Sequence, residues 1–239
     1  MSEVKTDKLS PRTALGTVTL GTSGDTFTIP SGVTLTNNGS SSGFDSGLAS
    51  VQTFTSSGTW TKPSGITKVI VEVQGAGGGA GSGDDYPAQS GGGGGYVKKL
   101  IDVSSISTAT ITVGSGGAGG IDANGTNGGD SSWVDGTNTL TGGGGVGGNW
   151  TNGGFITYSD NRGSATGGDL NIQGEVGQNA NGGSSFLGIG SYRINVNANA
   201  TDHATGYGSG GNAPSNSVSG SNYNGGPGKD GIVIVTEYK

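Results

Sequence analysis

The density of glycine between residues 75 and 231 constrains this chain more than any other feature of its sequence. The stretch contains 46 glycines in 157 residues. An ordered glycine loses about 0.5–1 kcal/mol more backbone entropy than an alanine, and apolar side chains are too sparse here to offset that loss by burial. An ordered fold therefore requires an arrangement that is specific to glycine, in which unsubstituted backbones lie against one another.

Packed polyglycine II helices meet this requirement. Extended left-handed helices of the polyproline II type have three residues per turn, rise about 3.1 Å per residue and contain no internal hydrogen bonds. Without side chains, such helices can approach closely, and their buried N–H and C=O groups can bond between helices. We expect the segments between the glycine runs to be loops at the ends of the packed helices. Four runs are long enough for about two turns: Gly75–Gly81, Gly91–Gly95, Gly114–Gly120 and Gly142–Gly148.

Alternation of apolar and polar residues predicts β-strands on both sides of the glycine runs. The strands at 68–74 and 231–238 are the most apolar, and we expect them to pair in one sheet, which brings the two ends of the glycine-rich stretch together. The predicted fold class is all-β: a β-sandwich-like body with packed polyglycine II helices and long loops. Its expected strands lie within Thr53–Pro63, Lys68–Gln74, Tyr96–Val103, Thr108–Val113 and Gly231–Tyr238.

The first 36 residues contain three short stretches in which threonine alternates with apolar residues: Thr17–Leu20, Thr26–Ile29 and Val33–Thr36. A ribbon of such strands with a single apolar row is marginally stable in water. We therefore expect three chains to bury the row around a threefold axis as a trimeric β-shaft; a tail that becomes ordered only on a partner is the alternative. The predicted domains are the shaft at 1–36, a Gly/Ser-rich linker at 37–52 and a glycine-rich body at 53–239.

Few residues are suited to catalysis. The chain has no cysteine, and its single histidine, His203, is expected on an exposed loop. A Gly-x-Ser-x-Gly nucleophile elbow between a strand and a helix is not evident. Eleven Lys and Arg residues and a net charge of −6 disfavour a nucleic-acid groove. We expect no enzymatic activity, no cofactor and no nucleic-acid partner.

The region 122–133 allows two interpretations. Asp122, Asn124, Thr126 and Asp130 follow the spacing of ligands in a calcium loop, but Trp133 stands where a bidentate Glu is needed. We therefore predict a turn-rich connector and no metal site, with a bound calcium ion as the alternative.

Aromatic and charged side chains concentrate between the glycine runs, among small polar residues. Recognition surfaces built from loops have this composition, because Tyr and Trp supply contact area at low entropic cost. Some aromatics are expected to cap the glycine helices instead, beginning with Trp133 and Phe186, which follow the related sequences Asn127–Ser132 and Asn181–Ser185. The predicted contact residues are Asp84, Asp85, Tyr86, Trp150, Phe155, Tyr158, Arg162, Tyr192, Arg193, Tyr207 and Tyr223.

Two parts of the chain are similar to bacteriophage proteins. Residues 53–79, TFTSSGTWTKPSGITKVIVEVQGAGGG, resemble the opening of the glycine-rich domain of phage tail-fibre and tail-appendage proteins. GGYV at 94–97, VGSGGAGG at 113–120 and GIVIVTEY at 231–238 resemble its later landmarks. GTSGDTFTIPSGVTL at 21–35, after KLSPR at 8–12, is similar to the leader of fibre and structural proteins from phages of marine bacteria.

The resemblance implies a virion tail-fibre or tail-tip adhesin. Long-tailed phages carry tip adhesins in which polyglycine helices pack into a slab and distal loops meet the host receptor. By this resemblance the body would bind a host polysaccharide or outer-membrane protein, and the N-terminus would trimerise the chain and attach it to other tail proteins. The residues expected at this attachment are Val4, Lys5, Lys8, Leu9 and Arg12.

Two other functions remain as alternatives. A structural decoration or collar protein of the virion would use the same loops to contact neighbouring subunits. An ice- or surface-binding glycine-rich protein would present flat faces with regularly spaced threonine, which the irregular aromatic segments disfavour. We expect the chain to be part of the virion after synthesis in the host cytoplasm, since its N-terminus lacks the apolar core of a signal peptide.

Overall fold

The computed structural model describes residues 26, 28, 31–33, 47–82, 88–150, 158–179, 181–192, 204–214 and 223–239. The chain divides into two compact units, Met1–Asp45 and Ser46–Lys239. The strands of the described residues all belong to the second unit. The predicted attachment residues, and most of the predicted N-terminal strands, lie outside the described residues.

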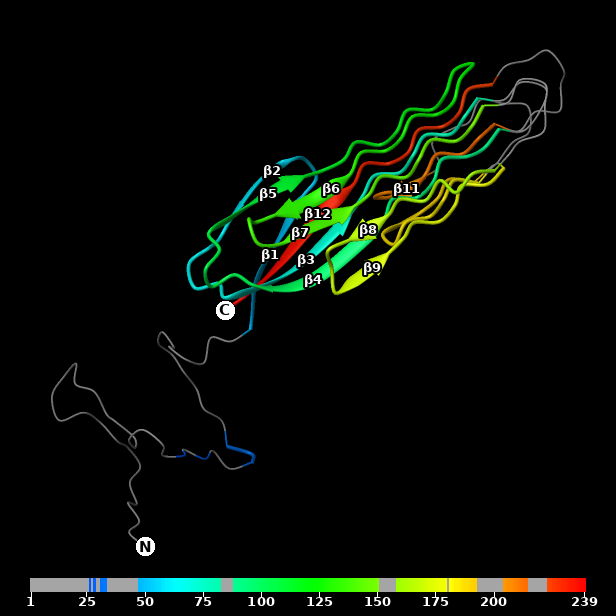
Figure 1. The fold of residues 1–239 in the computed structure, drawn as a ribbon. Coiled ribbons are helices and arrows are strands. Elements are labelled where there is room, and N and C mark those ends of the chain that lie inside the picture. The colour runs from blue at the N-terminus through cyan, green and yellow to red at the C-terminus, as the bar shows by residue number, and fades with distance from the viewer. Residues whose placement is uncertain are drawn as a thin grey trace, which may run out of the picture. The chain divides into compact units, whose positions relative to one another are not determined.

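Two five-stranded antiparallel sheets form one end of the second unit (Figure 1). The first sheet has the order β1 (Leu48–Phe54), β12 (Ile232–Tyr238), β3 (Lys68–Gln74), β4 (Tyr96–Asp102) and β9 (Leu170–Ile172). The second has the order β2 (Gly58–Thr61), β5 (Thr108–Thr112), β6 (Ser131–Val134), β7 (Thr139–Gly142) and β8 (Ala165–Thr166). A separate two-stranded sheet pairs β10 (Gly188–Ile189) with β11 (Thr205–Gly206). The fold is therefore all-β, as predicted.

The core lies between the two large sheets. Strand β3 buries every second residue, and Val69, Val71 and Val73 have no exposed surface. They pack in one cluster with residues of the second sheet, among them Trp60 and Trp133, whose ring centroids are 5.1 Å apart. Each such side chain contributes about 1.5–3 kcal/mol on burial. The alternation seen in the sequence thus becomes the inner face of a β-sandwich.

The predicted pairing of the two most apolar strands is confirmed. β3 and β12 are antiparallel neighbours, with Ile232 opposite Gln74. Their ends bring residues 75 and 231 together, so the glycine-rich stretch leaves and re-enters the sandwich at the same edge (Figure 1).

Glycine-rich segments continue from the ends of the strands and extend away from the sandwich (Figure 1). Their hydrogen bonds have a three-residue period. Along 75–82, successive N–H groups donate to three different segments in turn, and each segment is met again three residues later. In segment 88–95 the acceptors are the carbonyls of Gly95, Gly92 and Gln89, which bond the N–H groups of Gly75, Gly78 and Gly81. This pattern is that of packed polyglycine II helices.

Segment 75–82 is an interior helix of the array. Every one of its amides donates to another segment, namely 88–95, 123–129 or 226–229. Its carbonyls accept from three further segments, 117–120, 145–148 and 211. All residues of 75–82 are buried, and six neighbouring segments bond to this helix. Its buried N–H and C=O groups thus have the hydrogen-bond partners that buried peptide groups need.

The outer helices show the same period in their exposure. Gly114, Gly117 and Gly120 are buried, whereas Ser115 and Ala118 are exposed. Side chains therefore occur on the solvent face at every third position, where they meet no neighbouring backbone.

One expectation about the connections is wrong. The segment at 131–142 was expected to be a loop between glycine runs, but it forms the β6–β7 hairpin. Residues 96–112 contain β4 and β5, the two strands that the sequence predicted there. These segments return through the sandwich, because their apolar residues, such as Trp133 and Leu140, complete its core.

Candidate functional site

The helix ends that lie far from the sandwich come together, and we call this face the distal end. Ser82 N–H donates to the carbonyl of Ala123 (3.1 Å), and Gln89 N–H donates to that of Asn149 (3.0 Å). Gly225 N–H donates to the carbonyl of Gly120 (3.0 Å). The residues that flank segments 83–87, 151–157 and 215–222 are thus held at one end of the slab.

Five of the predicted contact residues lie outside the described residues: Asp84, Asp85, Tyr86, Phe155 and Arg193. Three others lie at the distal end, next to segments 151–157 and 215–222. Trp150 is partly exposed, and its N–H donates to Asn124 Oδ1 (2.6 Å). Tyr158 is 45% exposed and donates its hydroxyl to Asn179 Oδ1; partial burial raises the pKa of this hydroxyl. Tyr223 is partly exposed, two residues before Gly225.

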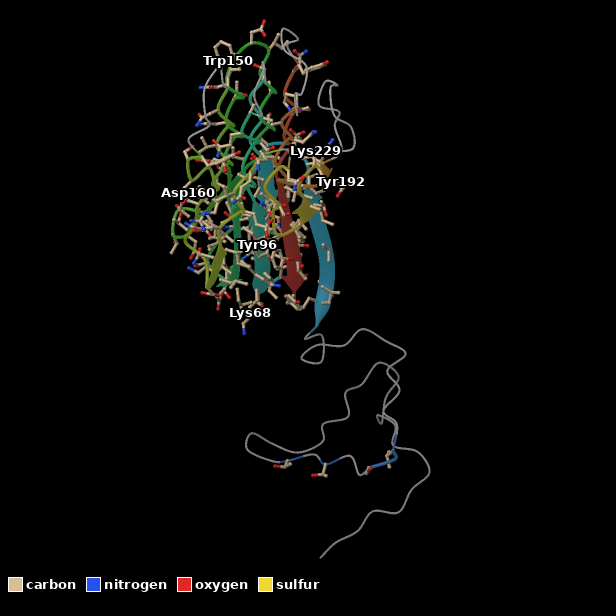
Figure 2. The ribbon with its side chains drawn as sticks, turned by 90° about the vertical axis from the view of Figure 1, so that its right-hand side faces the viewer. Lys68, Tyr96, Trp150, Asp160, Tyr192 and Lys229 are labelled. Atoms are coloured by element: carbon tan, nitrogen blue, oxygen red, sulfur yellow. The ribbon has the colours of Figure 1, made fainter. Side chains whose placement is uncertain are left out.

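The remaining predicted residues lie elsewhere on the slab. Figure 2 shows Trp150 near the end opposite Lys68, whereas Tyr192 lies at an intermediate height. Tyr207 follows β11 close to the sandwich, since the next residue, Gly208, donates its N–H to the carbonyl of Asp230 (2.8 Å). The structure therefore does not gather all the predicted residues into one surface.

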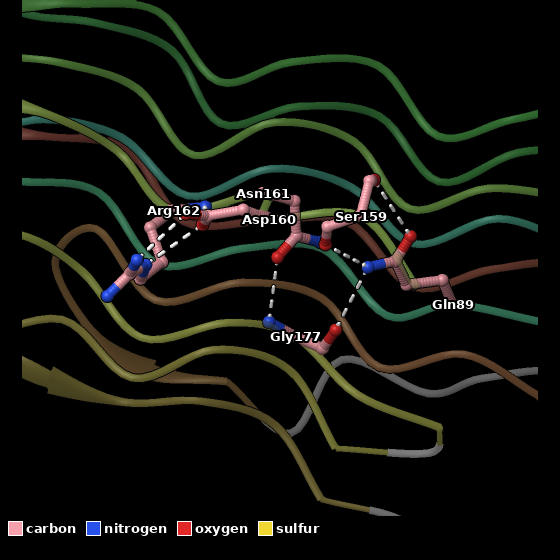
Figure 3. A network of polar contacts seen from close by, with 6 residues as sticks. All are labelled: Gln89, Ser159, Asp160, Asn161, Arg162 and Gly177. Atoms are coloured by element: carbon pink, nitrogen blue, oxygen red, sulfur yellow. Dashed lines mark hydrogen bonds and ion pairs between the residues drawn. The ribbon is translucent and has the colours of Figure 1, made fainter. Parts of the chain in front are cut away.

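Arg162 lies on a side helix, where it forms an ion pair with Asp160 (Figure 3). The guanidinium donates to both carboxylate oxygens, at 2.9 and 2.8 Å. These hydrogen bonds lower the pKa of Asp160 to about 2. Both side chains are exposed, so solvent screens the pair and it adds little to stability.

Buried side-chain amides join neighbouring helices, a feature that the sequence did not predict (Figure 3). Asn161 has no exposed surface; its Nδ2 donates to the carbonyl of Ser90 (2.8 Å), and its Oδ1 accepts from Gly177 N–H (2.9 Å). Gln89 Nε2 donates to the carbonyls of Ser159 (2.9 Å) and Gly177 (3.4 Å). An amide can satisfy both kinds of backbone group where the ideal packing is interrupted.

A groove of about 340 Å³ opens on the side of the slab. Its floor is the helix at 181–184, and its two walls are the helices at 175–178 and 189–192. Of the predicted contact residues that the structure describes, Tyr192 alone lines it. Sequence reasoning missed the polar residues of the groove, although their positions, three apart on each helix, were visible in the sequence.

The two aromatics expected to cap the glycine helices have different roles. Trp133 is fully buried in the sandwich core, where its Nε1 donates to Asp135 Oδ2 (2.9 Å). Phe186 is 55% exposed and stacks on Tyr96, with ring centroids 4.1 Å apart. The cap expectation is wrong for Trp133, because the residues before it re-enter the sandwich as β6.

The residues with calcium-loop spacing bond to the backbone of neighbouring helices. Asn124 Oδ1 accepts from Trp150 N–H, Thr126 Oγ1 from Ala118 N–H (2.7 Å) and Asp130 Oδ1 from Gly144 N–H (2.8 Å). Within the described residues no three His, Cys, Asp or Glu side chains are grouped so as to hold a metal ion.

No helix among the described residues has the length and apolar character needed to span a membrane.

Comparison with known proteins gives one assignment. The profile of a family described as a glycine-rich domain matches residues 49–238. A search of curated proteins returned no match. Because the profile covers the sandwich and the glycine helices together, the chain belongs to the glycine-rich domain family.

Proposed function

We propose that this chain is a phage virion tail-fibre or tail-tip adhesin that binds the surface of a bacterial host. The observation that carries the proposal is the distal end, where an array of packed glycine helices holds the flanks of three segments, each of which contains or adjoins an aromatic residue. The resemblance of residues 21–35 to phage leaders supports the setting in a virion. The receptor is a surface polysaccharide or an outer-membrane protein.

The interior helices give the distal end a rigid support. Residues 75–82, 88–97 and 208–214 are buried throughout, and every amide of 75–82 and 91–95 donates to another helix. Segments that are held at both ends lose less conformational entropy when they bind, which favours affinity. Copies assembled as a homotrimer on the tail through Val4, Lys5, Lys8, Leu9 and Arg12 would add avidity.

Binding to cells tests the proposal directly. The purified full chain should bind host cells and block infection by the parent phage. If it binds only to phage particles that lack it, the chain is a decoration or collar protein, and the adhesin proposal is wrong.

Exchange of segments tests the site. Replacing residues 149–162 and 191–207 by the corresponding segments of a related chain should move the host range. The matched control is an exchange of Ser104 and Ser105, two exposed residues of the β4–β5 turn at the end of β4 away from the glycine helices. Unchanged adsorption after exchange of both 149–162 and 191–207 would contradict the assignment of the contact surface.

A further inference from the structure

The groove on the side of the slab is built from three neighbouring helices in antiparallel order. Glu175 N–H donates to the carbonyl of Ser184 (2.9 Å), which joins one wall to the floor. Gly182 N–H donates to the carbonyl of Ser191 (2.7 Å), which joins the floor to the other wall. A Cβ added to Gly182 would lie 2.0 Å from the carbonyl oxygen of Gly210, so the floor packs directly against the next helix at this residue.

Each helix places two side chains in the groove, three residues apart. With three residues per turn and a rise of about 3.1 Å, such residues lie on one face about 9 Å apart. The hydrogen bonds align them in two rows across the groove. The row nearer the sandwich is Glu175, Ser184 and Ile189, and the row nearer the distal end is Gln178, Asn181 and Tyr192.

The two walls differ in chemistry. One wall is apolar and open to solvent, since Ile189 is 70% exposed and Tyr192 is 59% exposed. The other wall carries the carboxylate of Glu175 and the amide of Gln178. Side chains this exposed contribute little to the stability of the fold, so the fold itself does not explain their apolar character. An aromatic face opposite hydrogen-bonding groups is suited to a ligand with one apolar and one polar face.

We propose that this groove binds a short stretch of a neutral glycan. The C–H face of a sugar ring packs against Tyr192 and Ile189, while its hydroxyls bond to Gln178 and Asn181. The groove volume is within the usual range for small-ligand sites. The inference rests on the proposed function only in taking the glycan from the host surface.

The charge of the groove selects against anionic sugars. Glu175 is the acidic residue of the groove, and none of the described lining residues is Lys, Arg or His. A uronic acid in the groove would therefore place a second carboxylate near Glu175 with no basic side chain among the described lining residues, which like-charge repulsion disfavours. Neutral hexoses and N-acetylhexosamines avoid this penalty.

Titration of the full chain with simple sugars tests the groove. The probes are the methyl glycosides of glucose, galactose and N-acetylglucosamine, and methyl glucuronide is the anionic comparison. NMR spectra of the chain recorded at each sugar concentration give the Kd. We expect saturable binding of at least one neutral glycoside and weaker binding of the glucuronide. Tyr192→Ala should raise the Kd about tenfold through loss of ring stacking. The matched control is Ile121→Ala, which removes an exposed apolar side chain outside the groove.

The outcomes separate this inference from the proposed function. Absence of saturable binding by every neutral glycoside, or equal Kd values for Tyr192→Ala and Ile121→Ala, overturns the glycan site. If Tyr192→Ala lowers the thermal midpoint, Gln178→Ala replaces it, with the same expected weakening of binding. Host-cell binding that persists while the groove binds no sugar refutes the groove alone. Sugar binding by a chain that does not adhere to cells refutes the adhesin alone.

Discussion

Glycine is required at individual positions because other backbones occupy the space of a side chain. A Cβ added to Gly79 would lie 2.0 Å from the carbonyl oxygen of Ala118, a contact that no real Cβ makes. Gly58 in β2 is different, since an added Cβ would meet nothing within 4 Å. Gly79 of the array and Gly58 of the sandwich are therefore not equivalent.

Substitution of these two glycines by alanine should show whether close packing against neighbouring backbone, or only the conformational preference of glycine, determines stability. Gly79→Ala should lower the free energy of unfolding by about 3 kcal/mol, because overpacking against backbone cannot be relieved by a change of rotamer. Gly58→Ala should change it by less than about 0.5 kcal/mol. Chemical denaturation of both variants measures the difference, and a similar effect for the two would contradict the packed-helix arrangement.

Sequence reasoning at this scale succeeds for glycine and fails for the buried amides. The entropic cost of ordered glycine predicts that backbones pack closely, and they do. Gln74, Gln89 and Asn161 are fully buried, yet in sequence they resemble residues of exposed connections. Their partners are set by the packing of helices that are distant in sequence, as Gln89 and Ser159 show. A local pattern contains no information about such partners.

Two outer helices are joined by a ladder of side chains as well as by backbone bonds. Segment 123–130 donates N–H groups to segment 143–150 at Gly125 and Gly128, both at 2.9 Å. In the opposite direction, side-chain oxygens three residues apart accept backbone N–H groups. These acceptors are Asn124, Asn127 and Asp130, which bond Trp150, Gly147 and Gly144.

Removal of the middle acceptor, Asn127, should weaken the contact between segments 123–130 and 143–150. Asn127→Ala leaves the buried N–H of Gly147 without its acceptor, which should cost about 1–3 kcal/mol. Amide exchange at Gly147 should become faster, while that of Gly92 in the interior stays unchanged. Unaltered exchange at Gly147 would show that the side-chain ladder does not support the helix.

The β6–β7 hairpin is fastened by the carboxylate of Asp135. Burial favours the protonated form, but hydrogen bonds from Asn138, Trp133 and Thr137 outweigh it and lower the pKa of Asp135. A carboxyl whose pKa is lower in the folded chain than in the unfolded chain stabilises the fold above its unfolded pKa, about 3.9. This contribution is lost as the pH falls through the lower, folded pKa.

Asp135→Asn should therefore reduce the sensitivity of the fold to acid. At pH 7 the variant should be less stable than the parent, and the difference in stability should narrow as the pH falls below about 4, the unfolded pKa of an aspartate. Thermal midpoints of both chains across this range provide the measurement. A constant gap would mean that the carboxylate charge does not stabilise the hairpin.

At the scale of elements, the strands of the sandwich were predictable and the return path of the chain was not. Alternation located β3, β4, β5 and β12, because each has one buried face. The hairpin at 131–142 was missed because its strands are only four residues long and are flanked by glycine. The three-residue spacing of Ser115, Ala118 and Ile121 was the available signal for an outer helix.

The second unit combines two ways of hydrogen-bonding the N–H and C=O groups of its backbone. In the sandwich, apolar side chains drive burial and the strands bond in sheets. In the array, side chains are nearly absent and each helix bonds in several directions. Gln74 lies at the junction, where its Nε2 donates to the carbonyls of Gly75, Gly94 and Gly95. The sandwich fixes the starting points of the helices, and that register lets their backbones pair.

Hydrogen exchange should reveal the array as one cooperative body. A polyglycine II helix has no internal hydrogen bonds, so the protection of its amides depends wholly on its neighbours. Opening of segment 75–82 breaks bonds to six other segments, which leaves little room for local fraying. We therefore expect 75–82, 88–95 and 208–213 to exchange slowly and together, near the free energy of global unfolding.

The outer segment 123–130 is the internal comparison, since it is largely exposed and bonded on fewer sides. Its amides should exchange faster than those of the three interior segments in the same sample of the full chain. Exchange of 75–82 within the first seconds, or at the rate of 123–130, would show that the helices do not pack against one another. The rigid support on which the adhesin proposal depends would then be absent, because a loose glycine chain holds no segment at a fixed end.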